Sequence, residues 1–249
     1  MKETHLIIDF DSTFTKVEAL DVLCEIVLEG SAKKEQVLQK IQHITDLGMD
    51  GSIDFRTSLM ERLELIKAHK KDVLKLAEVL KEKISDSFKR NQAQLTALRD
   101  YVYIVSNGFK DFIQPVVESY GLRPDLVYAN EFIYDESGYV TGVNENIPLS
   151  KSGGKPLVIK ELALKGDVFV IGDGYNDFEI KKAGYANKFY LFTENVVREK
   201  VKPSADHIAP NVDEILYELD MERALSYPKN RIKVLLLEGV HKDAVALFE

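Results

Sequence analysis

The sequence has a single cysteine, no tryptophan and no long hydrophobic run. Cys24 therefore has no disulfide partner within the chain, which predicts a protein of the reducing cytoplasm. The longest apolar runs, such as residues 168–171 and 234–237, are far shorter than the ~20 residues that span a bilayer. Residues 6–8 lead directly into Asp9 without a cleavage-site pattern. We therefore expect neither a signal peptide nor a membrane partner.

The chain also lacks an excess of positive charge. It carries 33 basic and 41 acidic side chains, which gives a formal net charge of −8, and its pI is about 5.3. This balance argues against nucleic acid and anionic membranes as partners, so any bound phosphate must be held by local groups. Hydrophobic residues make up 45% of the 249 positions, which is typical of a soluble protein with one or two domains.

Short apolar stretches alternate with helical patterns along most of the chain. We expect strands at residues 5–10, 101–105, 168–171 and 188–192, helices at 114–120 and 157–164, and a β-hairpin between 127 and 143. Strands that alternate with helices favour an α/β fold with a parallel sheet.

A long helical segment interrupts this alternation after the first strand. From residue 18 to about residue 92 the apolar residues repeat with helical spacing. This segment is too long for a simple connection between two strands, so we expect an inserted cap domain. The predicted division is a core of residues 1–17 and 90–220, a helical cap of residues 18–89, and a tail of residues 221–249.

Three aspartates follow the predicted strands. Asp9 and Asp11 come after the first strand, and Asp173 follows the strand at 168–171. Ligands of open α/β sheets bind at the carboxyl ends of the strands, so these carboxylates are expected to converge. Such an oxygen-rich site suits Mg²⁺, and one carboxylate can attack phosphorus as a nucleophile. Taken singly, each aspartate could instead be a turn or helix-capping residue.

Two further groups are candidates for holding a phosphate. Ser106 ends the second core strand, and Lys155 follows two glycines at the start of a predicted helix. A helix N-terminus beside Ser106 could also bind a phosphate oxygen. Lys151 competes with Lys155 for this role, and we favour Lys155 because the two glycines allow a close approach.

Together these motifs resemble those of the haloacid dehalogenase superfamily of phosphohydrolases. The stretch from Asp9 to Thr13, the cap pattern between residues 44 and 62, and the sequence Gly-Asp-Gly-Tyr-Asn-Asp at 172–177 resemble, more narrowly, its phosphoserine phosphatases. The resemblance covers about residues 5–215. It implies a Rossmann-like parallel-sheet core with an inserted helical cap.

The resemblance also implies roles for individual residues. Asp9 would be the nucleophile and Asp11 the general acid and base, while Ser106 and Lys155 would hold the phosphoryl oxygens. The cofactor would be Mg²⁺, with these implied ligands: Asp9, the backbone carbonyl of Asp11, and Asp173, supported by Asp177.

The implied substrate contacts involve both the cap and the core. Glu18 would meet the ammonium group of a phosphoamino acid, and Arg62 would meet its carboxylate. The remaining implied contacts are Met49, Phe55, Asn107, Gly108 and Asn176. Without the resemblance, Glu18 and Arg62 would be taken as solvated helix charges, and Met49 and Phe55 as core residues. Asn107 stands where the family commonly has glycine, so its side chain could crowd the substrate carboxylate or donate a hydrogen bond to it.

The leading functional hypothesis is Mg²⁺-dependent hydrolysis of O-phospho-L-serine through an aspartyl-phosphate, the last step of serine biosynthesis. A second hypothesis keeps the chemistry but changes the substrate to another small phosphomonoester, or transfers the phosphoryl group to a second alcohol. A third is an inactive regulatory module, against which the complete set of acidic residues and Lys155 argues.

The last residues form a separate pattern. Residues 231–249 read as one strand and the start of a helix, and they resemble the beginning of D-3-phosphoglycerate dehydrogenase. The resemblance implies a phosphatase fused to, or associated with, a dehydrogenase domain. The alternative is a plain C-terminal strand and helix added to the core.

Overall fold

The computed structural model describes residues 3–49 and 52–225. A six-stranded sheet lies at its centre, with the strand order β3-β2-β1-β6-β7-β8. All neighbouring pairs run parallel, which confirms the predicted α/β fold class. The strands are β1 (Thr4–Ile8), β2 (Val102–Phe109), β3 (Val127–Asn130), β6 (Asp167–Gly172), β7 (Lys188–Phe192) and β8 (His207–Ala209).

Strand β1 shows why the sheet forms at this place in the sequence. Its side chains alternate between two buried clusters, because Leu6 and Ile8 pack into one and Ile7 into the other. A strand buried on both faces reads as a continuous apolar run, as this one does. The chain then builds β2 and β3 on one side of β1 before it crosses to β6 on the other side. The point where the strand order reverses therefore lies between β1 and β6.

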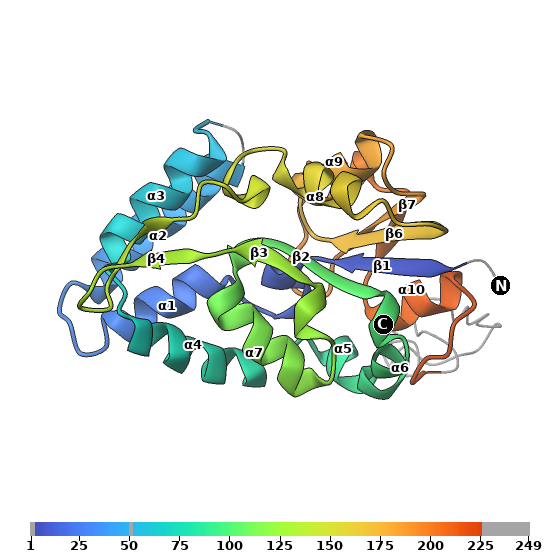
Figure 1. Ribbon diagram of the computed structural model, residues 1–249, viewed down its shortest axis with the longest axis horizontal. Coiled ribbons are helices and arrows are strands. Elements are labelled where there is room, and N and C mark those ends of the chain that lie inside the picture. Colours follow the sequence, from blue (N-terminus) through green and yellow to red (C-terminus); the bar gives the residue numbers. More distant parts are fainter. Residues whose placement is uncertain (1–2, 50–51, 226–249) are drawn as a thin grey trace, which may run out of the picture.

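Helices cover both faces of the sheet (Figure 1). Helices α8 (Gly154–Leu162) and α9 (Tyr175–Lys182) lie on one face. On the opposite face lie α5 (Asp86–Arg90), α6 (Gln92–Ala97), α7 (Lys110–Tyr120) and α10 (Val212–Glu218). Because helices pack on both faces, each of the two buried clusters lies between the sheet and a helical layer.

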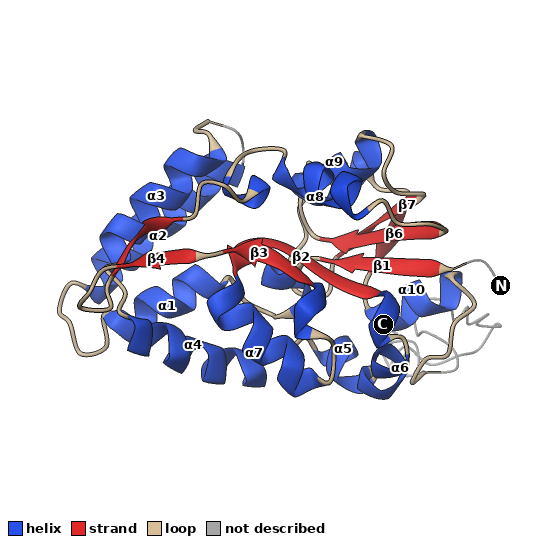
Figure 2. Cartoon of the chain, viewed as in Figure 1, coloured by secondary structure: helices blue, strands red, loops and turns tan. Residues whose placement is uncertain are grey.

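Four further helices extend beyond the end of the sheet (Figure 2). They are α1 (Ala19–Val27), α2 (Lys34–Met49), α3 (Phe55–Ile66) and α4 (Lys70–Glu82). None of the helices in the described ranges is long and apolar enough to cross a membrane.

The two segments that join these helices to the sheet run side by side. Thr15 pairs with Ile84 in an antiparallel bridge. Lys16 donates from its backbone to the carbonyl of Lys83 at 2.8 Å, and Ser85 donates to that of Phe14 at 3.0 Å. Entry to and exit from the helical segment are therefore fixed to each other.

The predicted hairpin at 127–143 is wrong in its first half. Val127 pairs in parallel with Ile104, so β3 joins the central sheet because its apolar residues are buried there. Only β4 (Phe132–Tyr134) and β5 (Val140–Val143) form an antiparallel pair. This hairpin reaches the helical end of the molecule, where the Val140 amide donates to the carbonyl of Ala68 at 2.9 Å.

Candidate active site

The chain makes a sharp turn directly after β1, and this turn carries the first two aspartates. Residues Phe10–Phe14 form one irregular helical turn, in which Ser12 has a left-handed φ of 54°. A non-glycine residue in this region is uncommon and is tolerated only where surrounding contacts hold it. The turn directs Asp9 and Asp11 toward one cavity of about 600 Å³.

Asp9 is held by one of its two carboxylate oxygens. Its Oδ1 accepts hydrogen bonds from the backbone amide of Phe10 at 2.7 Å and from Lys155 Nζ at 2.8 Å. The side chain is 13% exposed and lines the cavity. Since both bonds end on Oδ1, Oδ2 is the oxygen that remains for attack on a bound group.

Asp11 is oriented by the first residue of α1. Its Oδ1 accepts a hydrogen bond from the Ala19 amide at 2.7 Å. Its Oδ2 faces Gly108 and Ser106 of β2. A methyl group placed on Gly108 would lie 3.3 Å from Asp11 Oδ2 and 3.2 Å from Ser106 Oγ, so both oxygens border the same space. Burial raises the pKa of Asp11 well above its usual value, and the charge of Glu18 raises it further. The shift favours a carboxyl group that can donate a proton.

Ser106 and its neighbours form the next wall of the cavity. Ser106 is buried, and its Oγ accepts a hydrogen bond from the Gly108 amide at 2.9 Å. The helix N-terminus that the sequence suggested beside Ser106 lies farther along the chain, because strand β2 continues to Phe109 and α7 begins only at Lys110. The Asn107 amide donates to the carbonyl of Leu149 at 2.8 Å.

Lys155 connects two of the aspartates. Its Nζ lies 2.8 Å from Asp9 Oδ1 and 2.7 Å from Asp177 Oδ1, and its side chain is 3% exposed. Burial lowers the pKa of Lys155, but the charges of Asp177 and Asp9 outweigh it and raise the pKa above the ordinary value. Lys151 is exposed, so Lys155 is the lysine that the fold brings to the carboxylates.

Asp9, Asp173 and Asp177 form a compact acidic cluster. One carboxylate oxygen from each residue lies within 4.8 Å of the corresponding oxygens of the other two. Burial raises the pKa of Asp173 to about 6 and that of Asp177 to about 7. Buried hard oxygen donors of this kind fit a divalent cation such as Mg²⁺. The contribution expected from the Asp11 backbone carbonyl stays a prediction.

Glu18 lies at the border of the cavity, just before α1. Its Oε1 accepts a hydrogen bond from Ser12 Oγ at 2.6 Å and lies 3.6 Å from the guanidinium of Arg198. Burial raises the pKa of Glu18, whereas Ser12 and Arg198 oppose this change.

Arg62 reaches the same cavity from α3 and is only 9% exposed. Its Nε donates to the carbonyl of Ser58 at 3.1 Å, and its Nη1 donates to Thr45 Oγ1 at 3.4 Å. Burial lowers its pKa, while Glu18 partly opposes this shift. Among the described residues Arg62 forms no ion pair, so its charge is available to an anion in the cavity.

The remaining predicted contacts differ in how far the structure describes them. Gly108 and Asn176 line the cavity, as does Asn107. Met49 ends α2 and Phe55 begins α3, but both side chains lie outside the described part of the structure. The predicted tail lies outside the described residues from 226 onward.

The sequence interpretation missed Arg198 and Asn195, which lie in the loop after β7. Arg198 Nε donates to Asp173 Oδ2 at 2.6 Å, and this contact raises the pKa of Arg198 although burial opposes it. Asn195 donates to backbone carbonyls of the turn that carries Asp11. The signal was available, because this loop follows a core strand at the same edge of the sheet as the aspartates.

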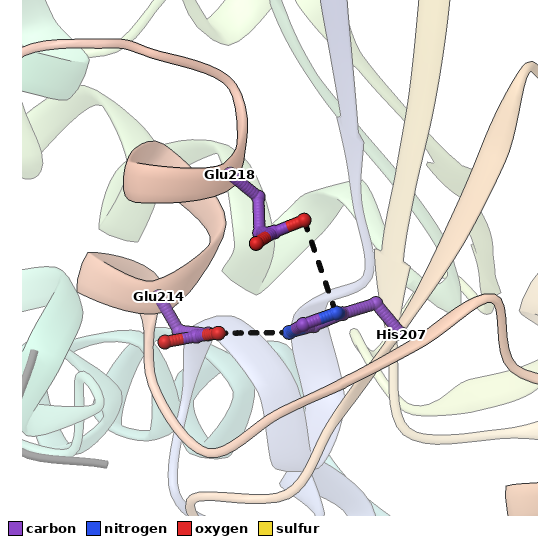
Figure 3. A group of neighbouring side chains, drawn as sticks. All are labelled: His207, Glu214 and Glu218. Atoms are coloured by element: carbon purple, nitrogen blue, oxygen red, sulfur yellow. Dashed lines mark hydrogen bonds and ion pairs between the residues drawn. The ribbon is translucent and has the colours of Figure 1, made fainter. Parts of the chain in front are cut away.

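A second group of candidate metal ligands involves β8 and α10 (Figure 3). The ring of His207 lies between two carboxylates, with Nε2 2.9 Å from Glu214 and Nδ1 4.0 Å from Glu218. Lys188 also contacts Glu218, at 3.4 Å. Because the two carboxylates face opposite edges of the ring, we interpret the group as packing between β8 and α10.

Comparison with known proteins agrees with this geometry. Residues 6–180 match the model of the haloacid dehalogenase-like hydrolases. The chain is 31% identical to the chloroplastic phosphoserine phosphatase of Arabidopsis thaliana over 216 residues, which cover 85% of this chain and 70% of the relative.

Two solved structures are also similar. One is a phosphoserine phosphohydrolase-like protein from Francisella tularensis, with 29% identity and a TM-score of 0.77, over 87% of this chain and 100% of the other. The second is a phospho-aspartyl intermediate analogue of phosphoserine phosphatase, with 25% identity and a TM-score of 0.71, over 88% and 99% of the two chains. The motif set, the parallel sheet and the family match agree: the chain belongs to the haloacid dehalogenase-like hydrolases.

Proposed function

We propose that the protein is a Mg²⁺-dependent phosphatase that hydrolyses O-phospho-L-serine to serine and phosphate through a phosphorylated Asp9. The observation that carries the proposal is the cavity itself. It places Asp9 beside the buried Lys155, and it is also lined by Arg62, whose guanidinium forms no ion pair with any described residue. Similarity to phosphoserine phosphatases along most of the chain supports the same substrate.

In the first step, Ser106 Oγ and Lys155 Nζ hold the oxygens of the phosphoryl group beside Asp9. Asp9 Oδ2 attacks phosphorus in line with the ester oxygen, so a bond from Asp9 to phosphorus forms as the bond to the serine oxygen breaks. Asp11 donates its proton to the departing oxygen. The raised pKa of Asp11, which follows from burial and from Glu18, favours the protonated form that this step requires.

In the second step, Asp11 acts as a base. Its carboxylate takes a proton from a water molecule that attacks phosphorus, and Asp9 leaves as a carboxylate. The Ala19 amide holds Asp11 Oδ1, so Oδ2 carries the proton in both steps. Bound Mg²⁺, held by Asp9, Asp173, Asp177 and the Asp11 carbonyl, would neutralise charge on the phosphoryl oxygens.

The rest of the cavity suits the amino-acid part of the substrate. Arg62 offers a planar fork of donors that matches a carboxylate, and its buried charge lacks an ion-pair partner among the described residues. Glu18 offers a carboxylate for the ammonium group. An anion site, a cation site and a phosphate site in one cavity match a zwitterionic phosphoamino acid.

We also propose that residues 18–89 act as a cap that closes over the substrate and excludes water during the first step. The antiparallel contact of Thr15 with Ile84 supports a common pivot for its two connections. In this proposal Met49 and Phe55 shield the site.

The test is phosphate release by the Mg²⁺-loaded enzyme from phosphoserine, phosphothreonine, phosphoethanolamine and sugar phosphates. We expect a preference for phosphoserine and no turnover by Asp9→Asn. Arg62→Gln should lower kcat/KM for phosphoserine roughly 10- to 150-fold, as expected for lost hydrogen bonds to a charged group. Phosphoethanolamine lacks the carboxylate, so its kcat/KM should change little.

Arg56→Gln is a matched control, because Arg56 lies on the same helix but pairs with Glu145 at the surface. It should leave both substrates unaffected. If no ester is hydrolysed, the enzyme assignment is wrong. If another ester is preferred, or if Arg62→Gln affects both substrates equally, the substrate assignment is wrong.

We further propose a cytoplasmic enzyme of serine biosynthesis whose residues 231–249 begin a fused dehydrogenase domain. The single buried thiol of Cys24 supports the location, and the resemblance of the last residues supports the fusion. A fluorescently tagged protein should distribute through the cytosol. Transcript sequencing should show a dehydrogenase reading frame after Glu249, and a stop codon directly after Glu249 would remove the fusion.

A further inference from the structure

A small hydrogen-bond network lies directly beside Ser106. The side-chain amide of Asn107 donates to the carbonyl of Leu149 at 2.8 Å. The buried amide of Asn130 donates to the same Leu149 carbonyl at 3.2 Å and to the backbone carbonyl of Asn107 at 2.8 Å. Asn107 is thus held in two ways. Its side chain bonds directly to Leu149, in the segment before α8, and its backbone carbonyl is joined to Leu149 through the side chain of Asn130.

The partner segment packs against the start of α8. Leu149 belongs to a buried helical turn, Pro148–Ser150, that packs closely against Gly154. A methyl group on Gly154 would clash with the carbonyl of Pro148 and would lie 2.8 Å from the Cα of Leu149. Since Gly154 directly precedes Lys155, this close packing joins the position of Leu149 to that of the first turn of α8.

The network therefore connects the two groups that hold the phosphoryl oxygens. Ser106 lies in β2 and Lys155 in α8, two elements from distant parts of the sequence. Asn107 adjoins Ser106 and bonds to Leu149, which in turn contacts the residue before Lys155. In the described ranges, Asn107 makes the one direct side-chain hydrogen bond between residues 106–108 and residues 148–155, and Asn130 adds an indirect bridge between them.

We propose that Asn107 is a positioning residue for the phosphate site: with Asn130 it sets the separation of Ser106 and Lys155 through the Leu149 carbonyl, and it does not bind the amino-acid part of the substrate. The proposal rests on the phosphatase function proposed above and refines it. It replaces the contact to the substrate carboxylate that the sequence suggested, because the amide that would make this contact is already bound to Leu149.

Two variants test the proposal. Asn107→Asp keeps the shape but turns a lone-pair-bearing oxygen toward the Leu149 carbonyl, which can only accept. Asn107→Gly removes the side chain and introduces the residue that the family commonly has at this position, so the variant is expected to fold. Asn146→Asp is the control, since Asn146 is exposed in a loop outside the cavity.

Two readouts distinguish positioning from substrate contact. The first is kcat/KM for phosphoserine, phosphoethanolamine and p-nitrophenyl phosphate, which share only the phosphate group. The second is the binding of inorganic phosphate to the Mg²⁺-loaded enzyme by calorimetry, which requires no turnover. Thermal unfolding shows that each variant is folded at the assay temperature.

We expect both variants to lower kcat/KM for all three esters by one common factor, roughly 2- to 12-fold, the range for one lost neutral hydrogen bond. The Leu149 carbonyl keeps the longer bond from Asn130 in both variants. Phosphate affinity should fall by a similar factor, and the control should match the wild type. A loss confined to phosphoserine would mean that Asn107 contacts the amino-acid part, and unchanged phosphate affinity in folded variants would mean that the network does not position the site. Either result overturns the proposal.

If the wild type hydrolyses p-nitrophenyl phosphate but not phosphoserine, the proposed function fails while the phosphate-binding test of Asn107 still stands.

Discussion

Asn195 should determine how firmly the helical segment is joined to the core. Its amide donates to Ser85 Oγ at 2.7 Å and to the carbonyl of Ser12 at 3.0 Å. Weaker contacts of 3.4 Å reach the carbonyls of Thr13 and Thr15. One side chain from the loop after β7 thus touches both connections of the helical segment and the turn that carries Asp11.

The sharpest perturbation is Asn195→Asp, compared with Asn195→Ala. Alanine removes two short hydrogen bonds at a half-buried site that water can partly re-enter, which costs about 2 kcal/mol at roughly 1 kcal/mol per bond. Aspartate keeps the shape but has no donor, and the carbonyls around it can only accept. The Ser85 hydroxyl cannot compensate, because it already donates to the Thr13 carbonyl at 2.6 Å. We therefore expect aspartate to cost about 3 kcal/mol or more, since it also places a charge against carbonyl oxygens.

Thermal unfolding measures the difference. For a chain of this size about 1 kcal/mol shifts Tm by roughly 2–4 °C, so Asn195→Ala should lower Tm by about 4–8 °C. Asn195→Asp should lower it further. Asn146→Asp, an exposed change of the same kind, should leave Tm unaltered. If aspartate at position 195 is as stable as alanine, or if both match the wild type, the amide does not secure these connections.

Three further changes have defined outcomes. Gly154→Ala should sharply lower phosphatase activity measured by phosphate release, because the added methyl group clashes with the Pro148 carbonyl directly before Lys155. Tyr120→Phe should lower the free energy of unfolding by about 1–2 kcal/mol in denaturant titrations, because the buried hydroxyl donates to the Phe88 carbonyl at 2.5 Å. Cys24 should resist alkylation by iodoacetamide from pH 7 to 9 in the native protein and react only after unfolding. Burial raises its pKa to about 11, so the reactive thiolate is scarce below that pH.

The fold and the centre of the site could be predicted from the sequence because their signals are local. Apolar strands followed by polar residues predict a parallel sheet with ligands at one edge, and Asp9 and Asp173 do lie together there. The hairpin was harder, because residues 127–130 carry the same alternating pattern whether they pair with their own turn or with β2. Which partner wins depends on burial against β2, a tertiary effect that the local pattern does not contain.

Arg198 and Asn195 escaped prediction for a different reason. Each acts on residues far away in the sequence, Arg198 on Asp173 and Glu18, and Asn195 on the turn after β1. The one local signal is that their loop follows the core strand β7, since the sequence around them contains neither a repeat nor a ligand spacing. Asn107 is intermediate, because its position beside Ser106 marked it as important, but only the structure shows that its amide points to Leu149.

The charge distribution explains how an acidic protein can bind a dianion. Carboxylates outnumber cationic side chains around the cavity. The acidic lining residues are Asp9, Asp11, Glu18, Asp54, Asp173, Asp177 and Glu179, the basic ones are Arg62, Lys155 and Lys200, and Arg198 adjoins the cavity through its ion pairs with Glu18 and Asp173. Lys155 and Arg198 are also already paired with carboxylates. In the described part of the chain, the cavity cations without an ion pair are the buried Arg62 and the exposed Lys200. A phosphate that approaches Asp9 would therefore meet net repulsion from the side chains alone. Substrate binding and a divalent cation on the acidic cluster should therefore be thermodynamically linked, each strengthening the other, because the cation reverses the sign of the local field that the phosphate meets.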